Sequence, residues 1–167
     1  MKTLAHTLIA TTLTAVGSAL MAAAPANAQA PALKHFMVAV SVKDLKAETD
    51  FYVDKLGFKL VKDVSVGGGR VFFRWLELGN ERLELIYSPT ATDTNPVRPK
   101  PTGHAGLHGF THFTMETADI EASKKALLAK GVTLAVDVTE VKDLGIKAIY
   151  VTDPEGNAVE IVQRVAN

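Results

Sequence analysis

Two glutamates lie in the middle of short apolar runs, at corresponding places in the two halves of the chain. Glu84 stands within residues 83–86 and Glu160 within residues 159–162, both rich in Leu, Ile or Val. A carboxylate in an apolar strand is unfavourable to bury unless a cation or a hydrogen-bond network compensates it. The sequence therefore predicts that Glu84 and Glu160 are catalytic; the alternative is that each faces water on the exposed side of a sheet.

Strand alternation adds a histidine and a methionine to these carboxylates. Successive side chains of a strand point to opposite faces, which predicts that His112 and Met37 face the same cavity as Glu84 and Glu160. Imidazole and carboxylate together are a common ligand set for a divalent metal ion. We therefore expect His112, Glu160 and Glu84 to bind a metal, with His35, two residues before Met37, as an additional candidate ligand. The pattern does not choose among Zn, Ni, Mn and Fe, and a site without metal is the alternative.

Other side chains are candidates for substrate contact. Met37 and Phe110 are expected on the cavity side of their strands. Arg74 could face the same cavity and bind a carboxylate or phosphate, or it could be a solvated charge at the edge of the sheet. Trp75, with the opposite parity, is expected in the core, and His108 is expected in a loop, where it could also close over the site.

The elements that must position these residues occur twice. Residues 35–87 and 109–164 follow one plan, in which Asp44 or Asp119 precedes a helical stripe and three strands follow. The order β-α-β-β-β in each half predicts an α+β fold. Its two tandem βαβββ modules would form a curved mixed sheet with a central cavity, and residues 88–108, rich in Pro, Thr and Gly, would link them.

The N-terminus is typical of an export signal. Lys2 is followed by a largely apolar stretch over residues 4–21 and by Ala26-Asn27-Ala28, a small-x-small pattern for signal peptidase. We expect residues 1–28 to be a signal peptide and residues 29–167 to be a single domain. The mature protein would then be periplasmic or secreted, with no membrane segment after cleavage.

The composition narrows the partners. The chain of 167 residues has 18 Lys and Arg, 18 Asp and Glu, and no cysteine. A balanced charge gives no electrostatic footprint for nucleic acid, so a small-molecule substrate is the expected partner. The absence of cysteine excludes disulfides and thiolate-bound metals.

Two stretches resemble the signatures of a known family. Residues 42–58, with Asp44-Leu45 leading to Phe51-Tyr52 and Leu56-Gly57-Phe58, are one, and residues 152–161, with Asp153-Pro154-Glu155-Gly156-Asn157, are the other. They are similar to the vicinal oxygen chelate (VOC) superfamily, which includes glyoxalase I, fosfomycin-resistance enzymes, extradiol dioxygenases and methylmalonyl-CoA epimerase. The resemblance implies a glyoxalase-like fold and a homodimer.

Carried over residue by residue, the resemblance matches Glu84, His112 and Glu160 to the second, third and fourth metal positions of glyoxalase I. Met37 stands where that family has its first histidine. The implied function is an exported, divalent-metal-dependent lyase or isomerase that acts on a small oxygen-bearing substrate through an enediolate-type intermediate. The alternatives are a metal-free binding protein of the bleomycin-resistance type, or an iron-dependent dioxygenase that uses His35, His112 and Glu160.

Overall fold

The computed structural model describes residues 32–92 and 99–165, and the account below concerns the unit that begins at His35. The expected signal peptide, residues 1–28, and part of the linker, residues 93–98, lie outside the described residues. No helix among the described residues is long and apolar enough to cross a membrane.

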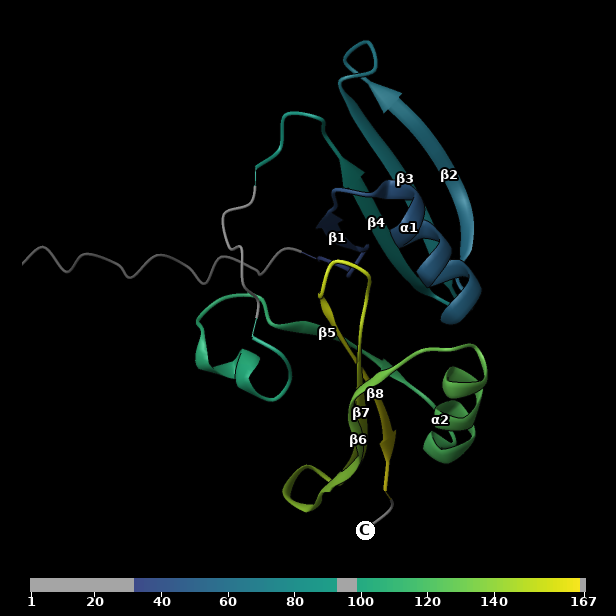
Figure 1. Ribbon diagram of the computed structural model, residues 1–167, viewed down its shortest axis with the longest axis vertical. Coiled ribbons are helices and arrows are strands. Elements are labelled where there is room, and N and C mark those ends of the chain that lie inside the picture. The colour runs from purple at the N-terminus through teal and green to yellow at the C-terminus, as the bar shows by residue number, and fades with distance from the viewer. Residues whose placement is uncertain (1–31, 93–98, 166–167) are drawn as a thin grey trace, which may run out of the picture. The chain divides into compact units, whose positions relative to one another are not determined.

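Both modules have the element order that the sequence predicts (Figure 1). The first consists of β1 (Val38–Ser41), α1 (Leu45–Asp50), η1 (Phe51–Lys55), β2 (Lys59–Val66), β3 (Val71–Leu78) and β4 (Glu81–Tyr87). The second consists of β5 (His112–Glu116), α2 (Ile120–Ala129), β6 (Leu134–Val141), β7 (Ile146–Thr152) and β8 (Ala158–Arg164). Short 3₁₀ turns occur at η2 (Gly103–Gly106) and η3 (Lys142–Leu144). The predicted α+β fold is confirmed.

The strands form two four-stranded mixed sheets, one for each module, with the orders β1-β4-β3-β2 and β5-β8-β7-β6. In each sheet the first strand pairs in parallel with the last one, and the remaining pairs are antiparallel. Helix α1 packs against β4, and α2 packs against β6, β7 and β8. Each helix therefore covers one face of its sheet, and the opposite face is available for other contacts.

The helices begin where the sequence predicts. The carboxylate of Asp44 accepts a hydrogen bond from the backbone N–H of Ala47 at 2.9 Å, and Asp119 accepts one from Ala122 at 2.9 Å. Both are N-caps, which satisfy backbone donors that a helix leaves unpaired at its start. The first helix changes to a π-helix over Phe51–Lys55, whereas α2 continues as a regular α-helix.

The helix-facing side of each sheet contributes to one buried apolar cluster. Leu83 and Leu85 of β4 are 2% and 0% exposed, and Val159 and Ile161 of β8 are 0% and 7% exposed. These residues alternate with Glu84 and Glu160. The alternation places both glutamates on the faces that the helices do not cover, as predicted.

Candidate functional site

Both carboxylate oxygens of Glu160 accept a hydrogen bond from a neighbouring side chain. Tyr150 of β7 donates its hydroxyl to Oε1 at 2.5 Å, and Thr114 of β5 donates to Oε2 at 2.6 Å. The Nε2 atom of His112 lies 3.4 Å from the same Oε2. Burial, followed by the hydrogen bond to Glu160, raises the pKa of Tyr150, so the phenol keeps its proton and remains a donor. These contacts give the Glu160 carboxylate one orientation.

His112 also contacts the segment between the modules. Its Nδ1 atom lies 3.0 Å from Nε2 of His104 and 3.0 Å from Oγ1 of Thr111. The rings of His104 and His112 have centroids 5.0 Å apart, and each also contacts the Tyr150 ring. Sequence reasoning did not assign His104 to the site. A loop histidine carries no strand periodicity, so no local signal identifies this contact.

Within residues 32–92 and 99–165, Glu84 has one hydrogen-bond partner, Trp75, which the sequence analysis placed in the core. The indole Nε1–H of Trp75 donates to Oε1 of Glu84 at 2.7 Å. The expectation that Trp75 belongs to the core beneath the helix is therefore wrong. The two-residue turn Gly79-Asn80 pairs Leu78 with Glu81, and this register places Trp75 directly opposite Glu84. Because directly paired residues share a face, the turn would have allowed this assignment from the sequence.

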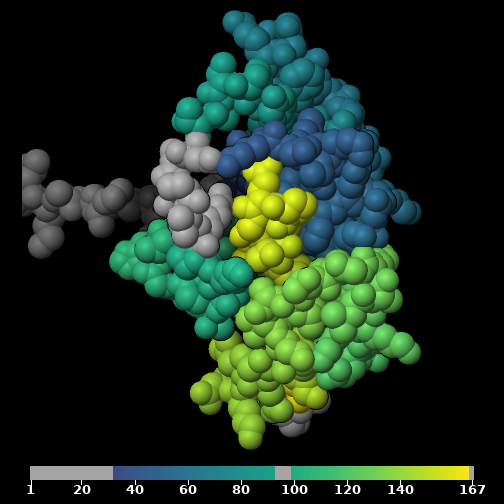
Figure 2. All heavy atoms as spheres, in the orientation of Figure 1, coloured from purple at the N-terminus to yellow at the C-terminus, as the bar shows by residue number. Residues whose placement is uncertain are grey.

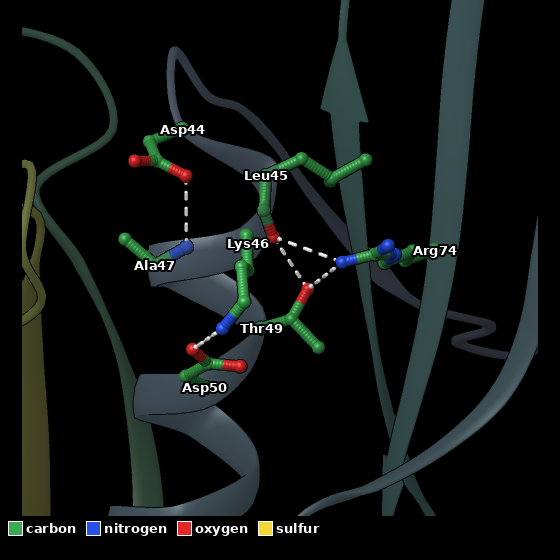
Figure 3. A network of polar contacts seen from close by, with 7 residues as sticks. All are labelled: Asp44, Leu45, Lys46, Ala47, Thr49, Asp50 and Arg74. Carbon is green, nitrogen blue, oxygen red and sulfur yellow. Dashed lines mark hydrogen bonds and ion pairs between the residues drawn. The ribbon is translucent and has the colours of Figure 1, made fainter.

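The same register corrects the position of Arg74. It pairs with the buried Leu85 and therefore faces α1, not the side that carries Glu84. Its Nη1 atom donates to the Thr49 hydroxyl at 2.9 Å and to the Leu45 carbonyl at 3.3 Å (Figure 3). Its Nε atom donates to Asp63 at 3.0 Å. Arg74 ties the first turn of α1 to the sheet, and the structure gives no support to its predicted role in substrate binding.

The remaining candidate residues are Met37, His35 and Phe110. Met37 is half-buried and lies just before β1. His35 is exposed, and its Nδ1 atom lies 3.9 Å from a carboxylate oxygen of Glu81. Phe110 is 73% exposed and lines a cavity described below.

The described residues of one chain do not form a complete metal-binding group. His112 and Glu160 lie together, but Glu84 belongs to the other sheet and is bound to Trp75. Among residues 32–92 and 99–165, no group of three or more His, Asp or Glu side chains is placed to hold a metal ion. A catalytic metal usually has three protein ligands, and one chain offers a preformed pair.

A cavity of about 420 Å³ lies between the two modules. It is lined by β1, by the segment before β5 and by the turn before β8, and its polar side chains include His104, His108, Ser41 and Asn157. Among the residues that the structure describes, no Lys, Arg, Asp or Glu lines it. The volume suits a small organic molecule, and the uncharged lining favours a neutral group at this position.

A buried polar network also connects the two modules. Glu48 of α1 is 0% exposed and accepts the backbone N–H of Glu155 at 2.9 Å, and Tyr52 donates its hydroxyl to Asp153 at 3.1 Å. Burial, followed by the charge of Asp153, raises the pKa of Glu48 to about 9. The raised pKa favours the protonated form of the Glu48 carboxyl in the folded protein.

The turn at residues 153–157 also contacts the chain just before α1. The Glu155 carboxylate accepts backbone hydrogen bonds from Lys43 at 2.6 Å and Asp44 at 2.8 Å. Figure 2 shows the yellow atoms from the end of the chain against the blue atoms of the first module. From the sequence, residues 152–161 were identified only as a stretch that resembles a family signature, and these polar contacts with the first helix were not predicted.

The chain belongs to the glyoxalase, bleomycin resistance protein and dioxygenase superfamily, whose family model matches residues 32–161. This match covers both modules. It agrees with the fold, in which two βαβββ modules carry matching acidic positions. The family includes enzymes and binding proteins, so membership alone does not decide between them.

Two characterised relatives are enzymes. Lactoylglutathione lyase GLX1 of Arabidopsis thaliana is 27% identical over 76% of this chain and 43% of its own length. Mitochondrial methylmalonyl-CoA epimerase of Mus musculus is 29% identical over 75% of this chain and 70% of its own length. This chain spans less than half of the lyase. Among solved structures, SMU.1112c superposes with a TM-score of 0.63 and 27% identity, over 78% of this chain and 98% of that one.

Proposed function

We propose that the protein is an exported, glyoxalase-like lyase or isomerase that moves a proton on a small oxygen-bearing substrate. The observation that carries this proposal is the pair of glutamates at matching strand positions, both on faces free of helix and both held by hydrogen bonds. The relatives named a lyase and an epimerase support the same class of reaction.

The proposed chemistry follows from what the side chains can do. A substrate whose carbonyl is next to a C–H bond on a hydroxyl-bearing carbon loses that proton to a carboxylate and passes through an enediolate-type intermediate. Glu84 is the proposed proton acceptor. The His112 imidazole, close to Glu160, is suited to donate a hydrogen bond to the substrate oxygen on which negative charge develops.

We further propose that the complete site forms between two copies of the chain. Glu84 lies in one sheet, while His112 and Glu160 lie in the other, and one chain does not bring the three together. A homodimer that pairs the first module of one copy with the second module of the other would do so. Such symmetric pairing creates two equal sites.

The first experiment asks for the reaction itself. A panel of small α-hydroxy aldehydes and ketones is incubated with the protein in D₂O, and loss of the C–H signal is followed by ¹H NMR. Wild type is expected to exchange at least one compound, and Glu84→Gln or Glu160→Gln is expected to slow exchange by about 100-fold or more. Glu116→Gln, which removes an exposed partner of Arg164, is the matched control. Exchange by none of the compounds, together with ligand binding, would favour the metal-free binding protein.

The second experiment tests where the site forms. Variants Glu84→Ala and Glu160→Ala are each expected to be inactive. When equal amounts of the two variants are unfolded and refolded together, so that their subunits exchange, the mixture should regain about a quarter of the wild-type activity. Half of the dimers are then mixed, and each has one intact site. A monomer in light scattering, or no recovery in the mixture, would contradict the shared site.

A second candidate role is metal binding, because His112 Nε2 and Glu160 Oε2 are already 3.4 Å apart. Glu84 of a second copy would supply the third ligand of a catalytic centre. Titration of Zn²⁺, Ni²⁺, Mn²⁺ and Fe²⁺ by calorimetry should then give one ion per site, and His112→Ala should abolish binding. Equal, weak binding by both proteins would contradict a metal cofactor.

Export is proposed on the sequence of residues 1–28. Mass spectrometry of protein from the native host should show a chain that begins at Gln29. Intact Met1 in the recovered protein would contradict export by cleavage.

A further inference from the structure

The two glutamates each have an aromatic hydrogen-bond donor at the same position of the neighbouring strand. Trp75 is the direct partner of Glu84 in the β3–β4 pair, and Tyr150 is the direct partner of Glu160 in the β7–β8 pair. In both modules the donor binds Oε1, at 2.7 Å from the indole and 2.5 Å from the phenol. The residue types differ, but the strand position and the bond are the same.

Both aromatic rings are themselves held in place. The ammonium of Lys62 lies 4.3 Å from the Trp75 ring centroid, the guanidinium of Arg82 lies 4.9 Å from it, and Phe36 packs edge-on at 5.8 Å. Cations over an aromatic face are attracted by its quadrupole. A donor with a fixed ring fixes the direction of its hydrogen bond, and through it the orientation of the carboxylate.

The neighbours on the other side of each glutamate make the two carboxylates different. Thr114 stands beside Glu160 in the β5–β8 pair, and Ala39 occupies the equivalent place beside Glu84 in the β1–β4 pair. Thr114 donates to Oε2 of Glu160 at 2.6 Å, and alanine has no donor. Among the described residues, Oε2 of Glu84 has no hydrogen-bond partner and is not one of the solvent-inaccessible unpaired atoms.

We propose that Trp75 and Tyr150 are positioning residues that hold the two carboxylates by Oε1, and that Ala39 leaves Oε2 of Glu84 free as the proton-accepting atom. Glu160, with both oxygens engaged, is the fixed partner of His112 and not the base. The base role rests on the proposed function; the positioning contacts do not.

The contact between Trp75 and Glu84 has a direct spectroscopic test. The chain has one tryptophan, so a ¹H–¹⁵N NMR spectrum contains one indole N–H signal. A hydrogen bond to a carboxylate is expected to move this signal downfield and to slow its exchange with water. Glu84→Ala should reverse both effects. An indole signal that does not change in Glu84→Ala would overturn the positioning role whether or not the protein is an enzyme.

The effect on chemistry is tested with variants that keep an aromatic side chain and remove the hydrogen-bond donor. Trp75→Phe and Tyr150→Phe are each expected to lower kcat for deuterium exchange by about 10- to 100-fold, the loss of one hydrogen bond to a charged group, with KM unchanged. Tyr87→Phe, at a tyrosine with no side-chain hydrogen bond in the described structure, is the control and should keep the wild-type kcat. A fall in stability with an unchanged kcat would show a merely structural role and overturn the proposal.

The free oxygen is tested by exchanging the neighbours. Ala39→Thr supplies Glu84 with the donor that Glu160 already has, so kcat should fall although no proposed catalytic residue changes. Ala39→Val, which has nearly the shape of threonine without its hydroxyl, controls for bulk. Equal rates in the threonine and valine variants would contradict the assignment of Oε2 as the base atom. If the indole signal responds to Glu84 but no compound exchanges, the enzyme function fails, and with it the base role, while the positioning contact stands.

Discussion

The two modules share one fold, but their helices make different contacts. Four residues after the N-cap, α1 has Glu48 and α2 has Ser123. Eight residues after the N-cap, η1, which continues α1, has Tyr52, and α2 has Leu127. Glu48 and Tyr52 bind the turn of the other module, whereas Ser123 bonds to Thr117 of its own module and Leu127 joins the apolar core. The polar contact between the two modules is therefore asymmetric, because the first helix supplies it and the residues at the matching positions of α2 do not.

The turns that these helices meet differ in the same way. In the second module, Asp153 accepts hydrogen bonds from the backbone of Glu155 and Asn157 and from the Asn157 side chain, so it shapes the turn as well as binding Tyr52. The first module has the two-residue turn Gly79-Asn80 in the equivalent connection. The longer turn therefore supplies hydrogen-bond partners for the other module's helix, and the two-residue turn is too short to do the same.

The largest expected effect of this difference is on pH dependence. Burial, followed by the charge of Asp153 and its hydrogen bond, raises the pKa of Glu48 to about 9, against about 4.3 in an unfolded chain. Between these values the folded protein holds a proton that the unfolded chain has lost. The free energy of unfolding should therefore be highest near about pH 5 and fall by up to about 1.4 kcal/mol per pH unit toward pH 9.

Urea unfolding at about pH 5, 7 and 9 measures this slope. Glu48→Gln, which is neutral at every pH, should flatten the curve, while Glu121→Gln, at an exposed position of α2, should leave it unchanged. A wild-type curve that is already flat from pH 5 to 9 would show that Glu48 is ionised in the folded protein.

The next effect is the loss of the turn's buried acceptor. Asp153 is 4% exposed, and Asp153→Ala leaves the Tyr52 hydroxyl and the donors of the turn unpaired. We expect destabilisation by about 3–5 kcal/mol, measured as a lower urea midpoint. Asp143→Ala, at an exposed acid in η3, is the control and should cost less than about 0.5 kcal/mol. Similar costs for the two would mean that the contact between modules adds little.

A smaller change would make the two sites more alike. Met37 occupies the position that His112 has in the second module, and imidazole suits Zn²⁺ better than a thioether does. Met37→His should therefore tighten Zn²⁺ binding by about tenfold, or about 1.4 kcal/mol, in a calorimetric titration. Met37→Leu keeps an apolar side chain and should show no gain. Weaker binding of an apolar ligand by Met37→His, with no gain for Zn²⁺, would favour the metal-free alternative.

The smallest effect concerns a contact that is equal in both modules. The Lys55 ammonium donates to the Lys130 carbonyl at 2.7 Å, and the Lys130 ammonium donates to the Lys55 carbonyl at 3.2 Å. Cations at the carbonyl end of a helix stabilise it modestly. Lys55→Ala and Lys130→Ala should each cost about 0.3–1 kcal/mol by urea unfolding, with Lys125→Ala as an exposed control. Clearly unequal costs would contradict the equivalence of this contact.

Much of the fold could be predicted from local patterns. The caps Asp44 and Asp119, the glycines that follow the helices and the alternation around Glu84 and Glu160 each act over a few residues. They require one local geometry whatever the rest of the chain does. The repeat of these patterns was enough to predict the order β-α-β-β-β, twice, and the exposed-face position of both glutamates.

The sequence held enough information to assign the two faces of β3, but only when several elements were combined. Arg74 and Trp75 were assigned to the wrong sides because strand alternation gives two faces but does not say which one is buried. The two-residue turn at Gly79-Asn80 sets the register with β4, and cross-strand pairing then places Trp75 beside Glu84. This information was in the sequence, but it required the turn and both strands to be considered together.

By itself the sequence determined the modules, their helix starts and the matching positions of Glu84, His112 and Glu160, because these depend on contacts between near neighbours in the chain. Only the tertiary structure decided that Glu48 meets the turn at Asp153, that His104 contacts His112, and that Glu84 and Glu160 lie in separate sheets. The Glu48 contact joins segments far apart in the sequence, and the His104 contact joins a strand to a loop that has no periodicity. Their formation depends on how whole modules pack, and no local pattern of residue types encodes that packing.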